Sequence, residues 1–417
     1  MKTAGKDGAA AFQFPDFRLF CVARLNSVFA QAMQNVAVGW FVFELTHSAF
    51  ALGLTGLFTF LPAVLVTPFT GHIADQFDRR AVVAIAYATA TFVAAGLFLY
   101  ALSGFTAVWP VYCLVIVLGA TRAFGNTALQ ALMPTLVPRD YFANAVAWTS
   151  SVQQFSNSAG PATGGLLYFF GAKVVFAVAA LGFAIASAST AAIKTRPERS
   201  KREKMSLATL TAGMRFIASR PIIFSSISLD MVAVCVGGVT ALLPIFANSL
   251  GVDAWGLGFL RSAQAIGAFI VAALLAHWPV RRRSGMVLLI SVTGYGLATI
   301  GFGLSTHVVT SIAFLVLVGG IDQVSAYIRS TFVQSDTPDS MRGRVAAVNT
   351  IFIGASGSLG EFESGTLASF VGAVPAVVIG GCGAIFFAVL WGILFPELRR
   401  RDALVTEHPE TEVSAAA

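Results

Sequence analysis

Long apolar segments recur along almost the whole chain, and they constrain the fold more than any other feature. One of them, VPAVVIGGCGAIFFAVLWGILF (374–395), contains no charge and exceeds the about 20 residues that a helix needs to cross a bilayer. Charged residues make up only 11% of the 417 residues, against about a quarter in a soluble domain. So little charge cannot cover a water-facing surface. The sequence therefore predicts a helical membrane protein that crosses the bilayer many times.

Twelve such segments are expected to span the membrane. They are continuous and lack the alternation of period two that a membrane β-barrel requires, so the fold class is an all-α integral membrane protein. Their approximate bounds are 17–43, 48–70, 81–103, 107–131, 145–170, 172–193, 221–247, 255–279, 286–305, 307–333, 345–371 and 374–396.

The basic residues fall almost entirely on one side of this predicted topology. Of 27 Lys and Arg residues, four lie in the interior of expected spans and one, Lys173, lies at an outer loop; the other 22 lie at the termini, in the loops or at the span ends of one side. Such an asymmetry marks the cytoplasmic side. We therefore expect both termini in the cytoplasm of a bacterial cell with an inner-membrane location, and the net charge of +7 reflects topology, not nucleic-acid binding.

The two halves of the chain resemble each other at an offset of about 200 residues. MPTLVPRDYFANAVA (133–147) corresponds to VQSDTPDSMRGRVAA (333–347), Gly160 and Gly165 correspond to Gly360 and Gly365, and Arg122 falls on Asp322. We expect two pseudo-symmetric six-helix bundles, the layout of a rocker-type secondary transporter. The expected parts are an N-terminal tail (1–16), a first bundle (17–193), a cytoplasmic linker (194–220), a second bundle (221–396) and a C-terminal tail (397–417).

A short cytoplasmic hairpin, GHIADQFDRR (71–80), follows the second expected span. It closely resembles the loop 2–3 motif of the major facilitator superfamily, with Gly71, Asp75, Arg79 and Arg80 in the expected places and Asp78 where glycine is usual. The resemblance implies a cytoplasmic gate, with Arg342 or Arg344 as the expected partner of Asp75. The alternative is a cluster of charges that only fixes topology.

Two further motifs carry the resemblance. GPATGG (160–165), with Gly160, Pro161, Gly164 and Gly165, is similar to the antiporter packing signature of the superfamily, although Ser156 replaces a common glycine. Arg122 resembles the arginine of its fourth span. The whole chain is most similar to the branch that includes the enterobactin exporter and drug antiporters. The family-like oligomeric state is a monomer.

Eight charged residues lie in the interior of expected spans, where each unpaired charge costs roughly 2.5–3.5 kcal/mol. We expect them to face one another or a wet cavity, and the four bases and four acids could balance; they are Arg24, Arg122, Arg261, Arg329, Asp230, Asp322, Glu361 and Glu363. The four acids are the proton-coupling candidates, the alternative being fixed structural pairs. Polar stripes on spans 1, 4, 7 and 10 predict a substrate cavity lined by Arg24, Gln31, Asn35, Arg122, Asn126 and Arg329.

Glu361 and Glu363 are about 200° apart around a helix and cannot face the same way. Glu361 shares its face with Gly354, Gly357, Ser358 and Gly365, a stripe of small residues that favours packing of another helix. The family resemblance places that helix, span 2, across the interface between the halves.

These features favour a secondary transporter that exports small amphipathic molecules, siderophore-like or drug-like, by proton antiport. A lysophospholipid flippase or a solute importer of the same fold is the alternative, and a non-transporting sensor or scaffold is a third. The sequence has no HExxH, GxSxG or P-loop motif, so we expect no enzyme activity, and it indicates no cofactor and no metal. The expected partners are a small-molecule substrate, protons and the lipid bilayer.

Overall fold

A computed structural model describes residues 10–195, 207–280 and 282–404. Within these ranges the side chains of residues 67–69, 71–75, 139, 143, 207–210, 339–340, 342–343, 347 and 350–351 are not described. The first half of the chain forms η1 (Ala10–Gln13), α1 (Pro15–Thr46), α2 (Ala49–Gln76), α3 (Arg79–Ser103), α4 (Trp109–Leu132), η2 (Met133–Thr135), η3 (Arg139–Tyr141), α5 (Phe142–Tyr168) and α6 (Ala172–Ala191). The second half forms α7 (Leu207–Ser219), α8 (Pro221–Gly237), η4 (Thr240–Leu242), α9 (Leu243–Ser249), α10 (Ala254–His277), α11 (Ser284–Gly303), α12 (Val308–Ser335), α13 (Asp339–Val371), α14 (Ala373–Leu394) and α15 (Pro396–Arg400).

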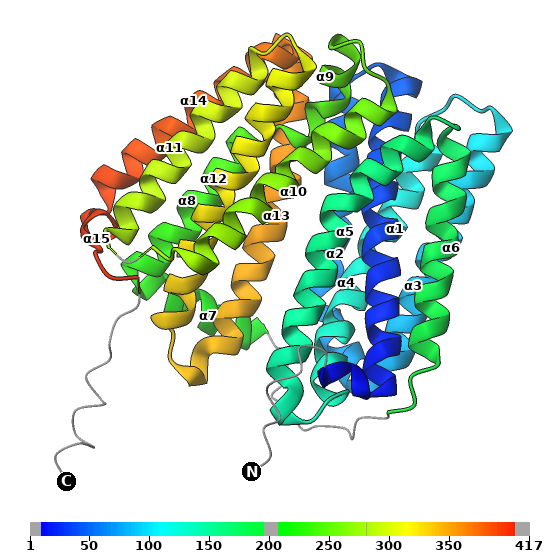
Figure 1. Cartoon of the computed structure of the whole chain (residues 1–417), viewed down its shortest axis with the longest axis horizontal. Coiled ribbons are helices and arrows are strands. Elements are labelled where there is room, and N and C mark those ends of the chain that lie inside the picture. The colour runs from blue at the N-terminus through cyan, green and yellow to red at the C-terminus, as the bar shows by residue number, and fades with distance from the viewer. Residues whose placement is uncertain (1–9, 196–206, 281, 405–417) are drawn as a thin grey trace.

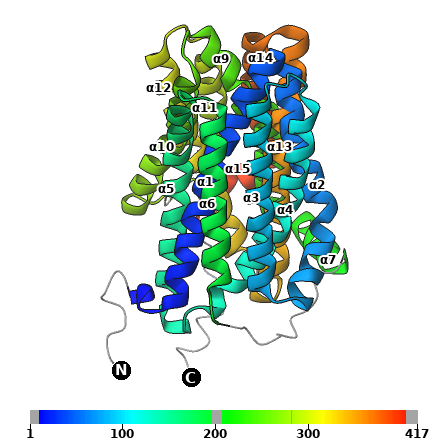
Figure 2. The ribbon, with the colours of Figure 1, turned by 90° about the vertical axis from the view of Figure 1, so that its right-hand side faces the viewer.

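Within each half the long helices run roughly parallel to one another (Figures 1 and 2), and Figure 1 shows those of the second half inclined to those of the first. Within the described residues, nine helical segments are long and apolar enough to cross a membrane, with α8 to α9 taken as one segment. α1, α5 and α13 are also 32, 27 and 33 residues long but richer in polar residues. The chain is therefore an all-helical, multi-pass membrane protein.

Helices pack mainly within their own half of the chain. α1 contacts α5 and α6, α4 contacts α2 and α3, and α3 contacts α6. In the second half α12 contacts α10 and α11, while α8 contacts α13 and α14. The most extensive contacts between the halves join α2 to α13 and α5 to α10.

The two crossing contacts are both built on glycine. A Cβ added to Gly365 of α13 would lie 2.6 Å from the Cα of Gly53 on α2, and one added to Gly165 of α5 would lie 2.7 Å from the Cα of Gly258 on α10. Backbones approach this closely only where side chains are absent. Gly165 and Gly365 are the residues that coincide at the 200-residue offset.

At one end of the molecule a single apolar core contains residues of both halves, whereas at the other end each half has its own core. One cluster contains both Val36 and Phe43 of α1 and Leu243 and Phe246 of α9. Toward the end that carries α7, the core divides into clusters that each belong to one half, around Phe17 in the first and around Phe332 or Ile223 in the second. The ribbons of α5 and α13 correspondingly diverge toward that end (Figure 1).

The expected seventh span (221–247) is interrupted, contrary to the continuous helix predicted. α8 ends at Gly237, and η4 and α9 resume the span after Gly238, whose backbone is extended. The carbonyl groups freed by this break find side-chain donors, because the Tyr295 hydroxyl donates to Gly237 at 3.0 Å and the Ser364 hydroxyl donates to Gly238 at 2.6 Å. A broken helix at membrane depth requires such replacement partners.

The segments expected as linker and tails contain further structure. Residues 207–219 of the linker form α7, which packs on α13 and α8. After α15 the chain folds back on the start of α11, where the Asp402 carboxylate accepts the Arg283 backbone N–H at 2.8 Å. Asp402 and Leu404 of the expected C-terminal tail (397–417) therefore pack on the second half. At the N-terminal end, Asp16 accepts backbone N–H groups of Lys194 and Thr195 after α6.

Candidate functional site

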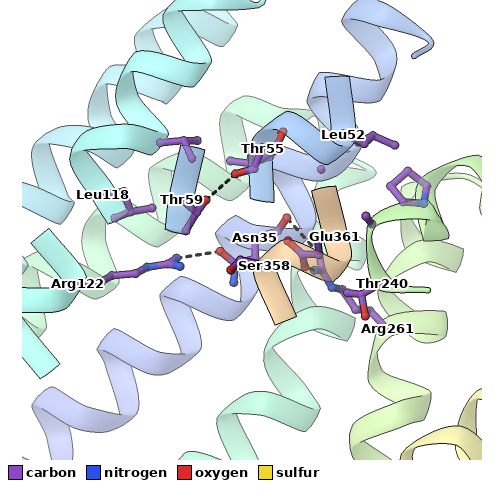
Figure 3. A pocket seen from close by; sticks show the side chains of 15 residues that line it. Asn35, Leu52, Thr55, Thr59, Leu118, Arg122, Thr240, Arg261, Ser358 and Glu361 are labelled. Carbon is purple, nitrogen blue, oxygen red and sulfur yellow. Dashed lines mark hydrogen bonds and ion pairs between the residues drawn. The ribbon is translucent and has the colours of Figure 1, made fainter. Parts of the chain in front are cut away.

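A polar cavity of about 210 Å³ lies between the two halves, close to the α2–α13 contact (Figure 3). It is lined from both halves by Asn35, Val38, Gly39, Leu52, Thr55, Thr59, Val115, Leu118, Arg122, Thr240, Ala241, Pro244, Arg261, Ser358 and Glu361. The broken seventh span supplies Thr240 and Pro244. The cavity therefore sits where α1, α2, α4, η4, α9, α10 and α13 meet.

Four of these residues form what we call the Glu361 cluster: Asn35, Arg122, Arg261 and Glu361. The Arg122 guanidinium donates to the Asn35 side-chain oxygen at 2.9 Å, and Arg261 donates to the Asn35 backbone carbonyl at 3.3 Å. A nitrogen of Arg261 lies 3.8 Å from a carboxylate oxygen of Glu361, an ion pair longer than a hydrogen bond. Arg122 also interacts electrostatically with Glu361. Two arginines on different halves thus share one loosely held carboxylate.

Packing against α2 positions the Glu361 side chain. A Cβ on Gly56 would lie 2.7 Å from a carboxylate oxygen of Glu361, so a larger residue at position 56 would displace this group. Gly365 packs on α2 one turn further along, as the stripe of small residues on α13 predicts. Gly354 and Gly357, however, have no atom within 4 Å of an added Cβ. The stripe contacts α2 only at the Glu361 end, because the halves diverge beyond it.

A second cavity of about 40 Å³ adjoins the first and shares Arg122 and Leu118 with it. Its polar lining residues are Arg24, Ser27, Gln31, Tyr87, Thr121, Arg122 and Asn126. The Ser27 hydroxyl lies 3.1 Å from that of Tyr87, and Arg24 interacts electrostatically with Tyr87. The structure therefore brings together five of the six predicted cavity residues: Arg24, Gln31, Asn35, Arg122 and Asn126.

Arg329, the sixth, lies elsewhere. It is 7% exposed and forms an ion pair with Asp230, joining α12 to α8. Neither residue lines either polar cavity. Asp230 of span 7 and Arg329 of span 10 therefore pair with each other. Spans 2, 8 and 11 line the larger cavity together with spans 1 and 4 and the part of span 7 after its break.

The other two acids also lie apart from the cavities. Asp322 of α12 has Tyr295 as its electrostatic neighbour. Glu363 lies beside Ser364, whose hydroxyl is 3.5 Å from its carboxylate, and interacts electrostatically with Cys235. Glu361 and Glu363 point in different directions, as predicted. Among the described residues these eight groups form only the Asp230–Arg329 and Glu361–Arg261 pairs. Arg24, Arg122, Arg261 and Glu361 line the polar cavities, which is the other placement expected for such charges.

The predicted gate is described only in part. The side chains of Gly71, Asp75 and Arg342 lie outside the described residues. Arg79 donates to the Ala131 carbonyl at 3.2 Å, Arg80 donates to the Ile193 carbonyl at 2.5 Å, and Arg344 lies 3.7 Å from the Met341 sulfur. Hydrogen bonds from Arg79 and Arg80 thus connect the start of α3 to the ends of α4 and α6.

The antiporter-like motif lies on two interfaces. Added Cβ atoms on Gly160 and Gly164 would come within 2.6 Å and 2.9 Å of Ala32 and Met33 on α1, whereas Gly165 packs on α10. Pro161 lies inside α5, which continues as one helix on either side of it. Its carbonyl oxygen faces Gly258 of α10.

Sequence reasoning left Arg261 and Gly56 out of the predicted site. The sequence identifies Arg261 as an intramembrane charge, but no polar stripe on its helix marks it as a cavity residue. Gly56 has no polar atom to signal it. Gly53 of span 2 corresponds to Gly258 of span 8 at an offset of 205 residues, and Gly165 of span 5 corresponds to Gly365 of span 11. Because span 11 packs on span 2, this correspondence also predicts that span 8 packs on span 5.

The fold and the polar cavity between the halves define a secondary transporter of the major facilitator superfamily, not an enzyme. A family model described as transmembrane secretion effector matches residues 7–416, and the chain belongs to that family. It is 28% identical over 387 residues to the enterobactin exporter EntS of Shigella boydii serotype 18, covering 93% of each protein. The enterobactin exporter EntS of Escherichia coli O1:K1 matches to the same extent.

Solved structures show the same fold at low identity. The nucleoside transporter NupG has a TM-score of 0.68 at 14% identity, over 91% of this chain and 99% of that one. A D-xylose–proton symporter has a TM-score of 0.70 at 14% identity, over 92% and 99%. A bacterial homologue of the human lysosomal transporter Spinster, in an inward-facing and unoccupied conformation, has a TM-score of 0.67 at 14% identity, over 92% and 96%.

Proposed function

We propose that this protein exports small amphipathic molecules from the cytoplasm by alternating access, in exchange for protons. In this proposal twelve spans form two six-helix bundles (17–193 and 221–396) in a bacterial inner membrane. The linker (194–220) and both tails (1–16 and 397–417) face the cytoplasm, and the protein works as a monomer. The cargo we propose is siderophore-like or drug-like, and the relatives named as enterobactin exporters support the first of these.

The observation that carries the proposal is the Glu361 cluster. Its carboxylate belongs to the second half, Arg122 belongs to the first, and Gly56 of α2 lies against the same side chain. Because the halves touch here and diverge toward α7, a change of charge at Glu361 acts on the contact that must open during transport. Protonation would release Arg261 and remove the attraction to Arg122, which loosens α13 from α2 and Asn35.

The divergence at the α7 end supports a conformation open to the cytoplasm. In the opposite conformation that end would close, and the pairing of Asp75 with Arg342 or Arg344 is our proposed latch. Charge reversal at Asp75 should impair transport, and simultaneous reversal at one of the two arginines should restore it. The latch is excluded if neither double variant regains activity.

The test of proton coupling is flux into proteoliposomes under an imposed pH gradient. We would measure enterobactin, Hoechst 33342 and a fluorescent lysophosphatidylcholine, with and without a protonophore. Glu361→Gln should abolish gradient-driven accumulation of the transported compound yet retain exchange without a gradient, because the variant cannot lose a proton. Glu397→Gln, an exposed glutamate of α15, is the matched control and should behave like the wild type.

The same assay with Asp230→Asn, Asp322→Asn and Glu363→Gln decides among the acids. If all four variants couple transport to the gradient as the wild type does, none of these acids carries the proton. Transport of the lysolipid alone would favour the flippase alternative, and accumulation in the direction of the proton gradient would favour an importer. No flux of any compound would favour a sensor or scaffold.

A further inference from the structure

We propose that the cargo is an anionic amphipath whose negatively charged group binds among Arg24, Arg122 and Arg261. This inference rests on the proposed transport function and names its substrate class. It follows from the charges that line the two adjoining polar cavities, and it does not depend on which group carries the proton.

The cavities contain more positive than negative charge. Their charged lining residues are three arginines and a single carboxylate, that of Glu361. If Glu361 is ionised, two positive charges are left uncompensated, and if it is protonated, all three are. Arginine stays protonated in proteins. The excess is therefore positive in both charge states of Glu361.

The other acids of the spans do not supply the missing negative charge. Asp230 is paired with Arg329, Asp322 lies beside Tyr295, and Glu363 lies beside Cys235 and Ser364. None of the three lines either cavity. Because uncompensated charge at membrane depth is costly, an anion that enters here from water gains more than a neutral molecule of the same shape.

The arginines also retain hydrogen-bonding capacity. A guanidinium carries five N–H donors, and the Nε groups of Arg24 and Arg122 are buried and have no hydrogen-bond partner among the described residues. Arg122 donates to Asn35 from another nitrogen. Planar donor groups of this kind match carboxylate and phosphate oxygens.

The size of the site indicates which part of the cargo it holds. The larger cavity, about 210 Å³, is smaller than the roughly 300 Å³ at which pockets for drug-sized ligands begin. It fits an anionic head group, with Leu52, Val38 and Leu118 beside it for adjoining apolar atoms. The larger apolar part of the cargo would extend into the space between the diverging halves.

The test compares ligands of one shape and different charge. Full-length protein in phosphatidylcholine nanodiscs is titrated with 2-naphthoate, 2-naphthamide and 2-naphthylmethylammonium, and affinity is measured by calorimetry in the absence of any gradient. Naphthoate should bind at least about tenfold more tightly than the amide, and the ammonium should not bind. A second arm uses lysophosphatidylglycerol and lysophosphatidylcholine as competitors, which tells a lipid source of the anion from a water-soluble one.

Arg122→Gln and Arg261→Gln should each reduce the preference for naphthoate and together abolish it, whereas Arg122→Lys should keep most of it. Arg400→Gln, which removes an exposed arginine of α15, is the matched control and should leave the preference unchanged. Equal affinities for the acid and the amide in the wild type, or a preference that survives both glutamine variants, would overturn the inference. A protein that couples flux to protons but shows no such preference would refute the anionic cargo and leave the proposed function standing.

Discussion

Asp230 and Arg329 form a buried ion pair between two helices of the second half. Both side chains are almost entirely enclosed between α8 and α12, and each is the ion-pair partner of the other. Removing one partner from a buried pair strands the other charge, which costs about 3–5 kcal/mol, whereas replacing both by neutral groups is often harmless. The pair is thus a structural connection between two helices of the second half.

Asp230→Asn should therefore lower the thermal unfolding temperature of the detergent-solubilised protein far more than Asp230→Asn combined with Arg329→Met. The expected recovery comes from removing the stranded guanidinium, and unfolding followed by tryptophan fluorescence measures it. If the decreases in unfolding temperature caused by the two substitutions simply add, so that the double variant is no more stable than Asp230→Asn, the two residues do not stabilise the protein as a pair.

The residues of the site also show how far sequence reasoning reaches. The helical spacing of Arg24, Gln31 and Asn35 on one stripe predicted that they line a common space, and the structure places them along the two cavities. The same reasoning placed Arg329 there, whereas in the structure Arg329 pairs with Asp230 outside the two cavities. A stripe of polar residues shows only that a helix face avoids lipid; whether it faces water or another buried charge depends on the neighbouring helix, which sequence does not specify.

Among the elements, α2 with α4 and α10 with α12 make equivalent contacts in the two halves. A Cβ on Gly119 of α4 would lie 2.1 Å from the Thr59 carbonyl oxygen, and one on Gly319 of α12 would lie 1.9 Å from the Gln264 carbonyl oxygen. Gly119 and Gly319 are again 200 residues apart. In both places a backbone carbonyl occupies the position of the missing side chain, so neither contact can yield by a rotamer change.

Gly119→Ala and Gly319→Ala should each destabilise the protein by about 1–3 kcal/mol, since overpacking forces the backbones apart. The matched control is Gly125→Ala on α4, where the nearest atom is a methyl group of Ala86 at 3.2 Å. Thermal unfolding of the three variants side by side checks the expectation. An alanine at 119 or 319 that costs no more than the one at 125 would contradict the close contact.

The expected duplication predicted which glycines correspond, but it could not show what they contact. Gly165 and Gly365 could have served packing within a half as well as between halves. The breaks in regular structure were harder still to predict, because the interruption at Gly238 depends on Tyr295 and Ser364, which are 58 and 126 residues further along the chain than the carbonyl groups they bind. Long apolar runs predict that a segment crosses the membrane, but not where a tertiary donor permits its helix to break.

At the scale of the whole molecule, the two glycine contacts between the halves lie at the same end. Gly53 meets Gly365, Gly165 meets Gly258, and the shared apolar core lies at the same end. Toward α7 the halves have separate cores. A transporter that alternates between two openings must break the contacts seen here when it reverses, so their strength sets the balance between its conformations.

An alanine at Gly365 should shift that balance without unfolding either half. The added methyl would lie within 2.8 Å of three backbone atoms of α2, all in the other half, whereas Gly357→Ala on the same helix meets open space. To measure this, the four native cysteines are replaced and spin labels are attached at Phe105→Cys, in the α3–α4 connection, and at Val309→Cys, at the start of α12. The mean distance between the labels should be longer in Gly365→Ala than in Gly357→Ala. Because helix propensity favours alanine over glycine at both sites, by about 1 kcal/mol, only the contact with α2 distinguishes the two variants. Identical distance distributions would mean that the α2–α13 contact does not hold this end of the molecule closed.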